Sequence, residues 1–92
     1  MDIKRSFGDA LRQARKARNM SQEDFSIISS RTYISSLERG LKSPTLEKVD
    51  RIAKEIGLHP LTLLTLAYSN SSKPKPLDEL IAQITAELDE II

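Results

Sequence analysis

The chain of 92 residues contains no cysteine and only one histidine, His59. The lack of cysteine excludes a disulfide framework, a cysteine-based zinc finger and a thiol nucleophile. The sequence also lacks a glycine-rich phosphate loop, a nucleophile–base pair and a cluster of metal-ligand residues, so we expect neither an enzyme nor a bound metal or cofactor. His59 directly precedes Pro60, and capping of a helix explains it without a catalytic role.

Long hydrophobic runs are missing as well. No apolar segment approaches the roughly 18 residues of a membrane-spanning helix. The N-terminal residues MDIKRSF lack the apolar core of a signal peptide. We therefore expect a cytoplasmic protein that does not contact a membrane. A chain of this length forms one small domain with a modest core, which is often marginally stable unless it oligomerises.

The charges divide unevenly along the chain. Residues 1–69 carry 12 Lys or Arg against 8 Asp or Glu, a balance of +4, whereas residues 70–92 carry 2 against 5, a balance of −3. A basic body with an acidic tail is typical of a nucleic-acid binder whose tail has another role. The balance of +4 alone does not distinguish such a binder from a protein with ordinary surface charge.

Apolar residues recur at helical spacing throughout, and no strand pattern competes. The sequence therefore predicts an all-α fold with helices at about Ser6–Arg18, Gln22–Ile28, Arg31–Arg39, Thr45–Gly57, Pro60–Tyr68 and Leu77–Ile92. Side chains that favour helix starts are predicted to cap the first, second and fourth helices: Ser6, Ser21 and Thr45. Gly40 is predicted to end the third helix in the left-handed region, and Gly57 to end the fourth.

The apolar stripes of the first four helices predict the core: Phe7, Ala10, Leu11, Ala14, Ala17, Phe25, Ile28, Ile34, Leu37, Leu46, Val49, Ile52, Ala53 and Ile56. The helix at 60–68 has leucines around nearly its whole circumference, at Leu61, Leu63, Leu64 and Leu66. We expect that helix to be largely buried.

The chain is predicted to have three parts: a domain at 1–69, a linker at 70–76 and an amphipathic helix at 77–92. One face of the last helix is acidic, and the other carries an apolar stripe: Leu77, Leu80, Ile81, Ile84, Leu88 and Ile91. An apolar stripe of this size does not stay exposed in water. It can pair with a second subunit or fold back onto its own bundle, and we expect pairing in a homodimer.

The helix at 31–39 has an unusual composition. With the residue before it, it presents short polar or cationic side chains: Ser30, Arg31, Thr32, Ser35 and Ser36. A solvated surface helix would seldom use them, because serine and threonine are poor helix formers. They suit the major groove of DNA, where arginine pairs with guanine and threonine contacts a base or a thymine methyl group.

Three segments carry a family resemblance: LRQARKARNMSQEDF, RTYISSLERG and SPTLEKVDRIAKEIGLHP. Over residues 7–66 the chain resembles the lambda-repressor-like, XRE-type helix-turn-helix family. The resemblance implies a five-helix bundle that binds operator DNA, usually as a dimer. The chain departs from the family between SQE and YIS, where it has about two residues fewer and no glycine.

The resemblance also implies roles for single residues. Gln22 would bind a phosphate and brace the base-reading helix, and Arg15 and Glu38 would form a structural ion pair. Lys42 and Ser43, which follow Gly40, are expected along the DNA backbone. For two further residues the sequence leaves two alternatives open. Tyr33 either binds a phosphate or covers the edge of the core. Arg39 either contacts DNA or only stabilises the end of its helix.

The leading hypothesis is a sequence-specific, dimeric transcription regulator, most simply a repressor of a near-palindromic operator. The alternative is an antitoxin or another protein-interaction module that also represses its own operon. Its protein partner would bind the last helix or the leucine-rich helix at 60–68.

Overall fold

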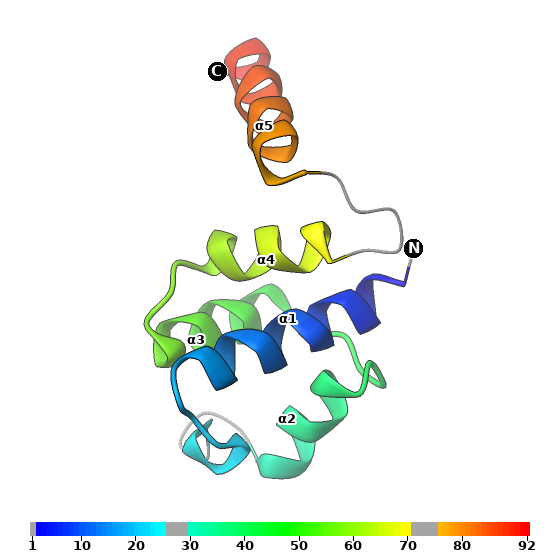
Figure 1. Ribbon diagram of the computed structural model, residues 1–92, viewed down its shortest axis with the longest axis vertical. Helices are drawn as coiled ribbons and strands as arrows, with labels where there is room; N and C mark the ends of the chain where they lie inside the picture. Colours follow the sequence, from blue (N-terminus) through cyan, green and yellow to red (C-terminus); the bar gives the residue numbers. More distant parts are fainter. Residues whose placement is uncertain (1, 26–29, 71–75) are drawn as a thin grey trace.

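A computed structural model of the chain describes residues 2–25, 30–70 and 76–92. Its elements are α1 (Ile3–Ala17), the 3₁₀ turn η1 (Gln22–Phe25), α2 (Arg31–Glu38), α3 (Leu46–Ile56), α4 (Pro60–Ser69) and α5 (Leu77–Ile91). The described ranges contain helices and no strand. The predicted all-α fold is therefore confirmed, with a lambda-repressor-like bundle from α1 to α4 and a separate C-terminal helix (Figure 1).

Helix α1 lies at the centre of the bundle, between α2 on one side and α4 on the other (Figure 1). The fully buried large side chains come from five of the elements: Phe25, Leu11, Ile34, Leu37, Ile52 and Leu63. Helix α3 closes the core through its stripe of Val49, Ile52, Ala53 and Ile56, as its periodicity predicts.

Helices α1 and α2 approach each other closely at Gly8. A Cβ atom there would overlap the carbonyl oxygen of Leu37 and lie 2.8 Å from that of Glu38. The absence of a side chain at this position therefore lets the end of α2 rest directly on α1.

Helix ends follow the capping rules in most places. Thr45 Oγ1 accepts a hydrogen bond from the Lys48 amide at 3.2 Å, as predicted. Gly40 and Gly57 have φ of +73° and +87°, the left-handed conformation expected of glycines that end helices. The predicted start of the first helix is wrong: Asp2 caps α1 through Oδ1, which accepts from the Arg5 amide at 3.3 Å, and Ser6 is buried within the helix.

The second predicted helix is described only in part. Residues 22–25 form the turn η1, while the rest of the predicted helix, including Ile28, lies outside the described residues. The Ser21 amide donates to Asp24 Oδ2 at 2.7 Å, which is one of the two bonds of a capping box. Most of the predicted linker, residues 71–75, also lies outside the described ranges, so the three-part division of the chain stays a prediction.

Three predictions about the core are wrong. Ala17, at the end of α1, is exposed, and Leu46, the first residue of α3, is 82% exposed. Both residues lie in the terminal turn of their helix. Neighbouring elements cover the middle of each helix but do not reach its end. Helix α4 is not largely buried: Leu63 and Ala67 face the core, whereas Leu61 is 63% exposed. Part of the circumference of α4 packs on the bundle, and Leu61 lies outside that part.

Candidate nucleic-acid interface

Helix α2 presents its first turn to solvent and its later residues to the core. Ser30 Oγ caps the helix by accepting from the Tyr33 amide at 3.1 Å. Ile34 and Leu37 are fully buried, and this packing fixes which face of α2 points outward. Arg31 and Thr32 are exposed at the start of that outward face, and Ser35 follows one turn later, half-buried. The oxygen of Ser30 serves the cap, but its hydroxyl hydrogen can still be donated.

Ser36 is a correction to the predicted base-reading set. Its side chain is almost wholly covered in the fold, with 6% exposed. A side chain covered in this way cannot reach a DNA groove. Ser35, its neighbour along the helix, is half-buried and keeps part of its surface exposed.

Arg31 is not an isolated cation. Its Nη1 lies 3.7 Å from Oε1 of Glu23 in the preceding turn η1, and both side chains are largely exposed, at 67% and 73%. Glu23 was not singled out from the sequence. An acid near a base-reading arginine is visible only when η1 and α2 are brought together.

Two lysines lie close to the ring of Tyr33. The ammonium groups of Lys42 and Lys48 lie 5.8 and 5.5 Å from the centre of its ring, within range of a cation–π interaction. Tyr33 is half-buried, so it covers the core edge and also exposes part of its ring, while Lys42 and Ser43 are exposed. Lys48 was missed in the sequence. Its place three residues after the cap Thr45 puts it in the first turn of α3, beside the loop that carries Lys42.

Arg39 lies at the C-terminal cap of α2 and is exposed. Its Nε approaches the carbonyl oxygen of Ser35 at 3.4 Å, near the limit of a hydrogen bond. A cation at a helix C-terminus also interacts favourably with the helix dipole. These contacts supply a structural reason for Arg39, and a role in DNA binding stays a prediction.

The end of α2 is tied to the rest of the bundle by Glu38, whose side chain is 1% exposed. Arg15 of α1 holds it with two short bonds, Nε to Oε2 at 2.7 Å and Nη2 to Oε1 at 2.9 Å. Gln22 donates from Nε2 to Oε1 at 3.2 Å. Arg12, which the sequence did not point to, lies 3.5 Å from Oε1 through its Nε. The amide of Gln22 thus braces α2 from η1.

Burial alone would raise the pKa of Glu38, because it disfavours the charged carboxylate. The hydrogen bonds from Arg15 and Gln22 and the positive charges of Arg15 and Arg12 outweigh burial and hold the pKa below its ordinary value. In return, the hydrogen bond to Glu38 raises the pKa of Arg15 against the opposing effect of burial. Glu38 is therefore a buried anion that joins α1, η1 and α2, and its charge is compensated on the inside of the bundle.

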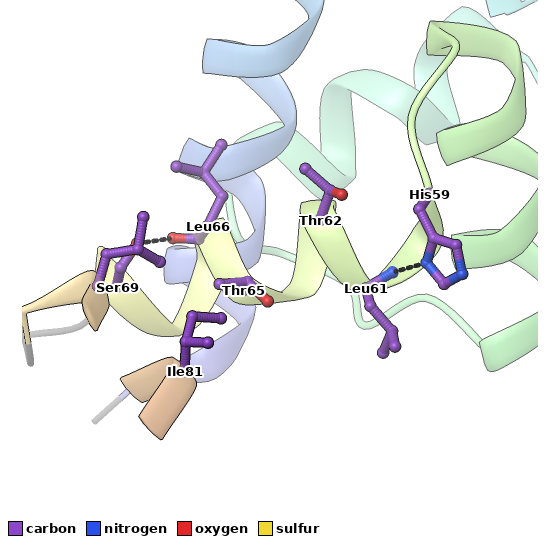
Figure 2. A pocket seen from close by; sticks show the side chains of 8 residues that line it. His59, Leu61, Thr62, Thr65, Leu66, Ser69 and Ile81 are labelled. Carbon is purple, nitrogen blue, oxygen red and sulfur yellow. Dashed lines mark hydrogen bonds between the residues drawn. The ribbon is translucent and has the colours of Figure 1, made fainter. Parts of the chain in front are cut away.

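A second surface lies between α4 and α5, away from α2 (Figure 1). Two apolar cavities of about 490 and 280 Å³ open there. Figure 2 shows the larger one, which is lined by Leu61, Thr65 and Leu66 of α4 and by Ile81 of α5. His59 stands at its edge and accepts a hydrogen bond from the Leu61 amide through Nδ1 at 3.0 Å, in the capping position expected from the sequence.

The predicted dimerisation stripe divides into two parts. Its first four members line these cavities: Leu77, Leu80, Ile81 and Ile84. Leu88 and Ile91 line neither and are 47% and 79% exposed. No residue of α5 is buried, because the helix projects away from α4 (Figure 1).

The described residues hold no group of three or more His, Cys, Asp or Glu that could bind a metal ion. Within the same ranges, none of the helices combines the length and apolarity needed to cross a membrane.

Comparison with known proteins identifies similar sequences. Residues 11–63 match the family described as "Helix-turn-helix". The control protein C.BamHI of Bacillus amyloliquefaciens is 41% identical over 77 residues, which cover 80% of this chain and 95% of that protein. The control protein C.SmaI of Serratia marcescens is 39% identical over 67 residues, which cover 71% and 80% of the two chains. No solved structure matches the chain. The family match runs from within α1 into α4 and so includes the whole of α2.

Proposed function

The chain belongs to the XRE-type helix-turn-helix family of DNA-binding transcription regulators, and we propose that it acts as a homodimeric repressor of a near-palindromic operator. The observation that carries this proposal is the outward face of α2, where exposed Arg31 and Thr32 stand on a helix whose opposite face is fully packed. A rigid helix with such a face is what major-groove recognition requires.

We propose that residues in the first two turns of α2 contact the bases. The guanidinium of Arg31 pairs with the O6 and N7 atoms of guanine, and Thr32 and Ser35 contact neighbouring bases. The DNA backbone is held by side chains and amides around this helix. We assign that role to Gln22, Ser30, Tyr33, Arg39, Lys42 and Ser43, and add Lys48 because it shares the ring of Tyr33 with Lys42.

The proposed dimer forms through α5 and the uncovered face of α4. Five large aliphatic side chains of α5 are between 38% and 79% exposed in one chain: Leu77, Ile81, Ile84, Leu88 and Ile91. Covering their exposed parts in a second subunit would contribute roughly 4–8 kcal/mol. A two-fold axis through this surface leaves both α2 helices free to enter successive major grooves, about 34 Å apart.

Relatives that are named control proteins support a regulatory role for this chain. A bound dimer would repress by covering the promoter. We assign it no catalytic activity, since its family acts by binding DNA, and we place it in the cytoplasm with the DNA that it binds.

The dimer proposal is tested by Ile84→Lys, which puts a charge into the cavity lined by Leu61, Leu80 and Ile84. The matched control is Ala86→Lys, which adds the same charge about 200° away around α5. Sedimentation equilibrium should show that Ile84→Lys weakens the dimer at least tenfold and that Ala86→Lys leaves it intact. If both variants dimerise like the wild type, α5 is not the dimerisation element.

A further inference from the structure

The ion pair between Glu23 and Arg31 lies on the surface of the protein. The two side chains are 73% and 67% exposed, and exposed pairs of this kind contribute little to stability. The 3.7 Å separation between Oε1 and Nη1 is longer than a charge-assisted hydrogen bond. The pair is therefore loose, and a stronger partner can displace it.

The position of Arg31 in the helix is electrostatically unfavourable. It occupies the first turn of α2, at the positive end of the helix dipole, where a cation is unfavourable and an acid would be preferred. The first turn of α2 contains no acid, so Glu23 brings the nearby negative charge from η1. Both side chains line one polar hollow with Gln22, on the side of the molecule to which the proposed function assigns DNA binding.

We propose that Glu23 is a specificity-determining residue that prevents Arg31 from acting as a general phosphate contact. This inference rests on the proposed function, because it requires α2 to face DNA. A phosphate would attract Arg31 less strongly, because Glu23 already supplies a negative charge beside the guanidinium. The phosphate would also be repelled by the Glu23 carboxylate. Guanine offers two acceptors in the fork geometry of the guanidinium without a negative charge. Glu23 therefore weakens binding to random DNA more than binding to the operator.

The test compares wild type with Glu23→Gln, using the full chain and fluorescence anisotropy on two duplexes of equal length. One duplex carries the operator, identified beforehand by selecting bound sites from random DNA. The other carries a scrambled version of that sequence. Glu23→Gln should strengthen binding to scrambled DNA about fivefold and change operator affinity less than twofold. The salt dependence on scrambled DNA should become steeper by about one unit, because Arg31 now neutralises a phosphate.

The matched control is Glu47→Gln, which removes another exposed carboxylate, in the first turn of α3. It should change the affinity for both duplexes by the same factor. In an Arg31→Ala background, Glu23→Gln should behave like this control, because its effect on discrimination acts through Arg31. The melting temperature of Glu23→Gln should stay within about 2 °C of wild type, which separates discrimination from folding.

Two results would overturn the inference: an unchanged affinity ratio in Glu23→Gln, or the same change of ratio with and without Arg31. A wild-type protein that does not distinguish the two duplexes would instead refute the proposed function, and the inference would fall with it.

Discussion

Removing Arg15 tests how the bundle holds its DNA-binding helix in place. Arg15→Ala deletes two short bonds to Glu38, at 2.7 and 2.9 Å, and a third to the Met20 carbonyl oxygen at 2.9 Å. The Glu38 carboxylate, 1% exposed, then remains buried with Gln22 and Arg12 as its partners. Breaking a buried pair from one side costs about 3–5 kcal/mol. We expect about 3 kcal/mol, because these two partners still compensate part of the charge.

A loss of this size is large for so small a protein. A domain of this length has a total stability of about 5–14 kcal/mol, and 3 kcal/mol corresponds to a melting temperature roughly 12–24 °C lower. Urea unfolding followed by circular dichroism at 222 nm measures the difference. The control is Arg12→Ala, whose side chain is 44% exposed and 3.5 Å from Glu38, and which should cost less than about 1 kcal/mol.

The reasoning would be refuted if Arg15→Ala cost no more than Arg12→Ala. It also predicts that the double variant Arg15→Ala/Glu38→Ala is destabilised by clearly less than the sum of the single variants, because removing both partners leaves no buried charge. Strictly additive losses would show that the two residues stabilise the protein independently.

Three further predictions follow from the same structure. Acid should reduce the stability advantage of wild type over Arg15→Ala: the lowered pKa of Glu38 stabilises the fold fully above its ordinary value of 4.5, and this contribution is lost as the pH falls from there through the lower pKa of the folded state. Urea titrations at pH 6 and pH 3 measure this, and an advantage of equal size at both would contradict it. Gly8→Ala should lower stability by about 1–3 kcal/mol, although alanine favours helices, because its Cβ would overlap the Leu37 carbonyl oxygen; an unchanged urea midpoint would disprove the close contact. Lys42→Ala should weaken binding to operator and random DNA by the same factor and reduce the salt slope by about one unit, and a loss confined to the operator would make Lys42 a base contact.

The sequence predicted the fold well where local signals agree. Thr45, Gly40 and Gly57 combine side-chain and backbone preferences that act within one or two helical turns, and each does in the structure what its residue type favours. The start of α1 was missed because Asp2 and Ser6 are both good caps, and only the extent of packing decides between them. Periodicity likewise says which face of a helix is apolar, but not how far its neighbours extend. Leu46 and Leu61 were placed in the core for that reason.

Some of the site residues could be predicted from the sequence, and others could not. The contact of Arg15 with Glu38 came from the family resemblance, and the structure brings the two side chains together. Ser36 was grouped with Ser35 because composition does not show which of two neighbouring serines the fold covers. The contacts of Glu23 and Lys48 join separate elements, so no pattern along the chain could indicate them.

Selection of bound sites from random DNA, done in parallel with wild type and Arg31→Ala, tests the central claim most directly. Wild type should enrich a near-palindromic site whose half-sites lie about 10 base pairs apart. Arg31→Ala should bind with about 1–3 kcal/mol less free energy and lose its preference at one symmetric guanine in each half-site. Enrichment of a single unrepeated half-site would contradict the dimer, and an identical preference in both proteins would contradict base reading by the first turn of α2.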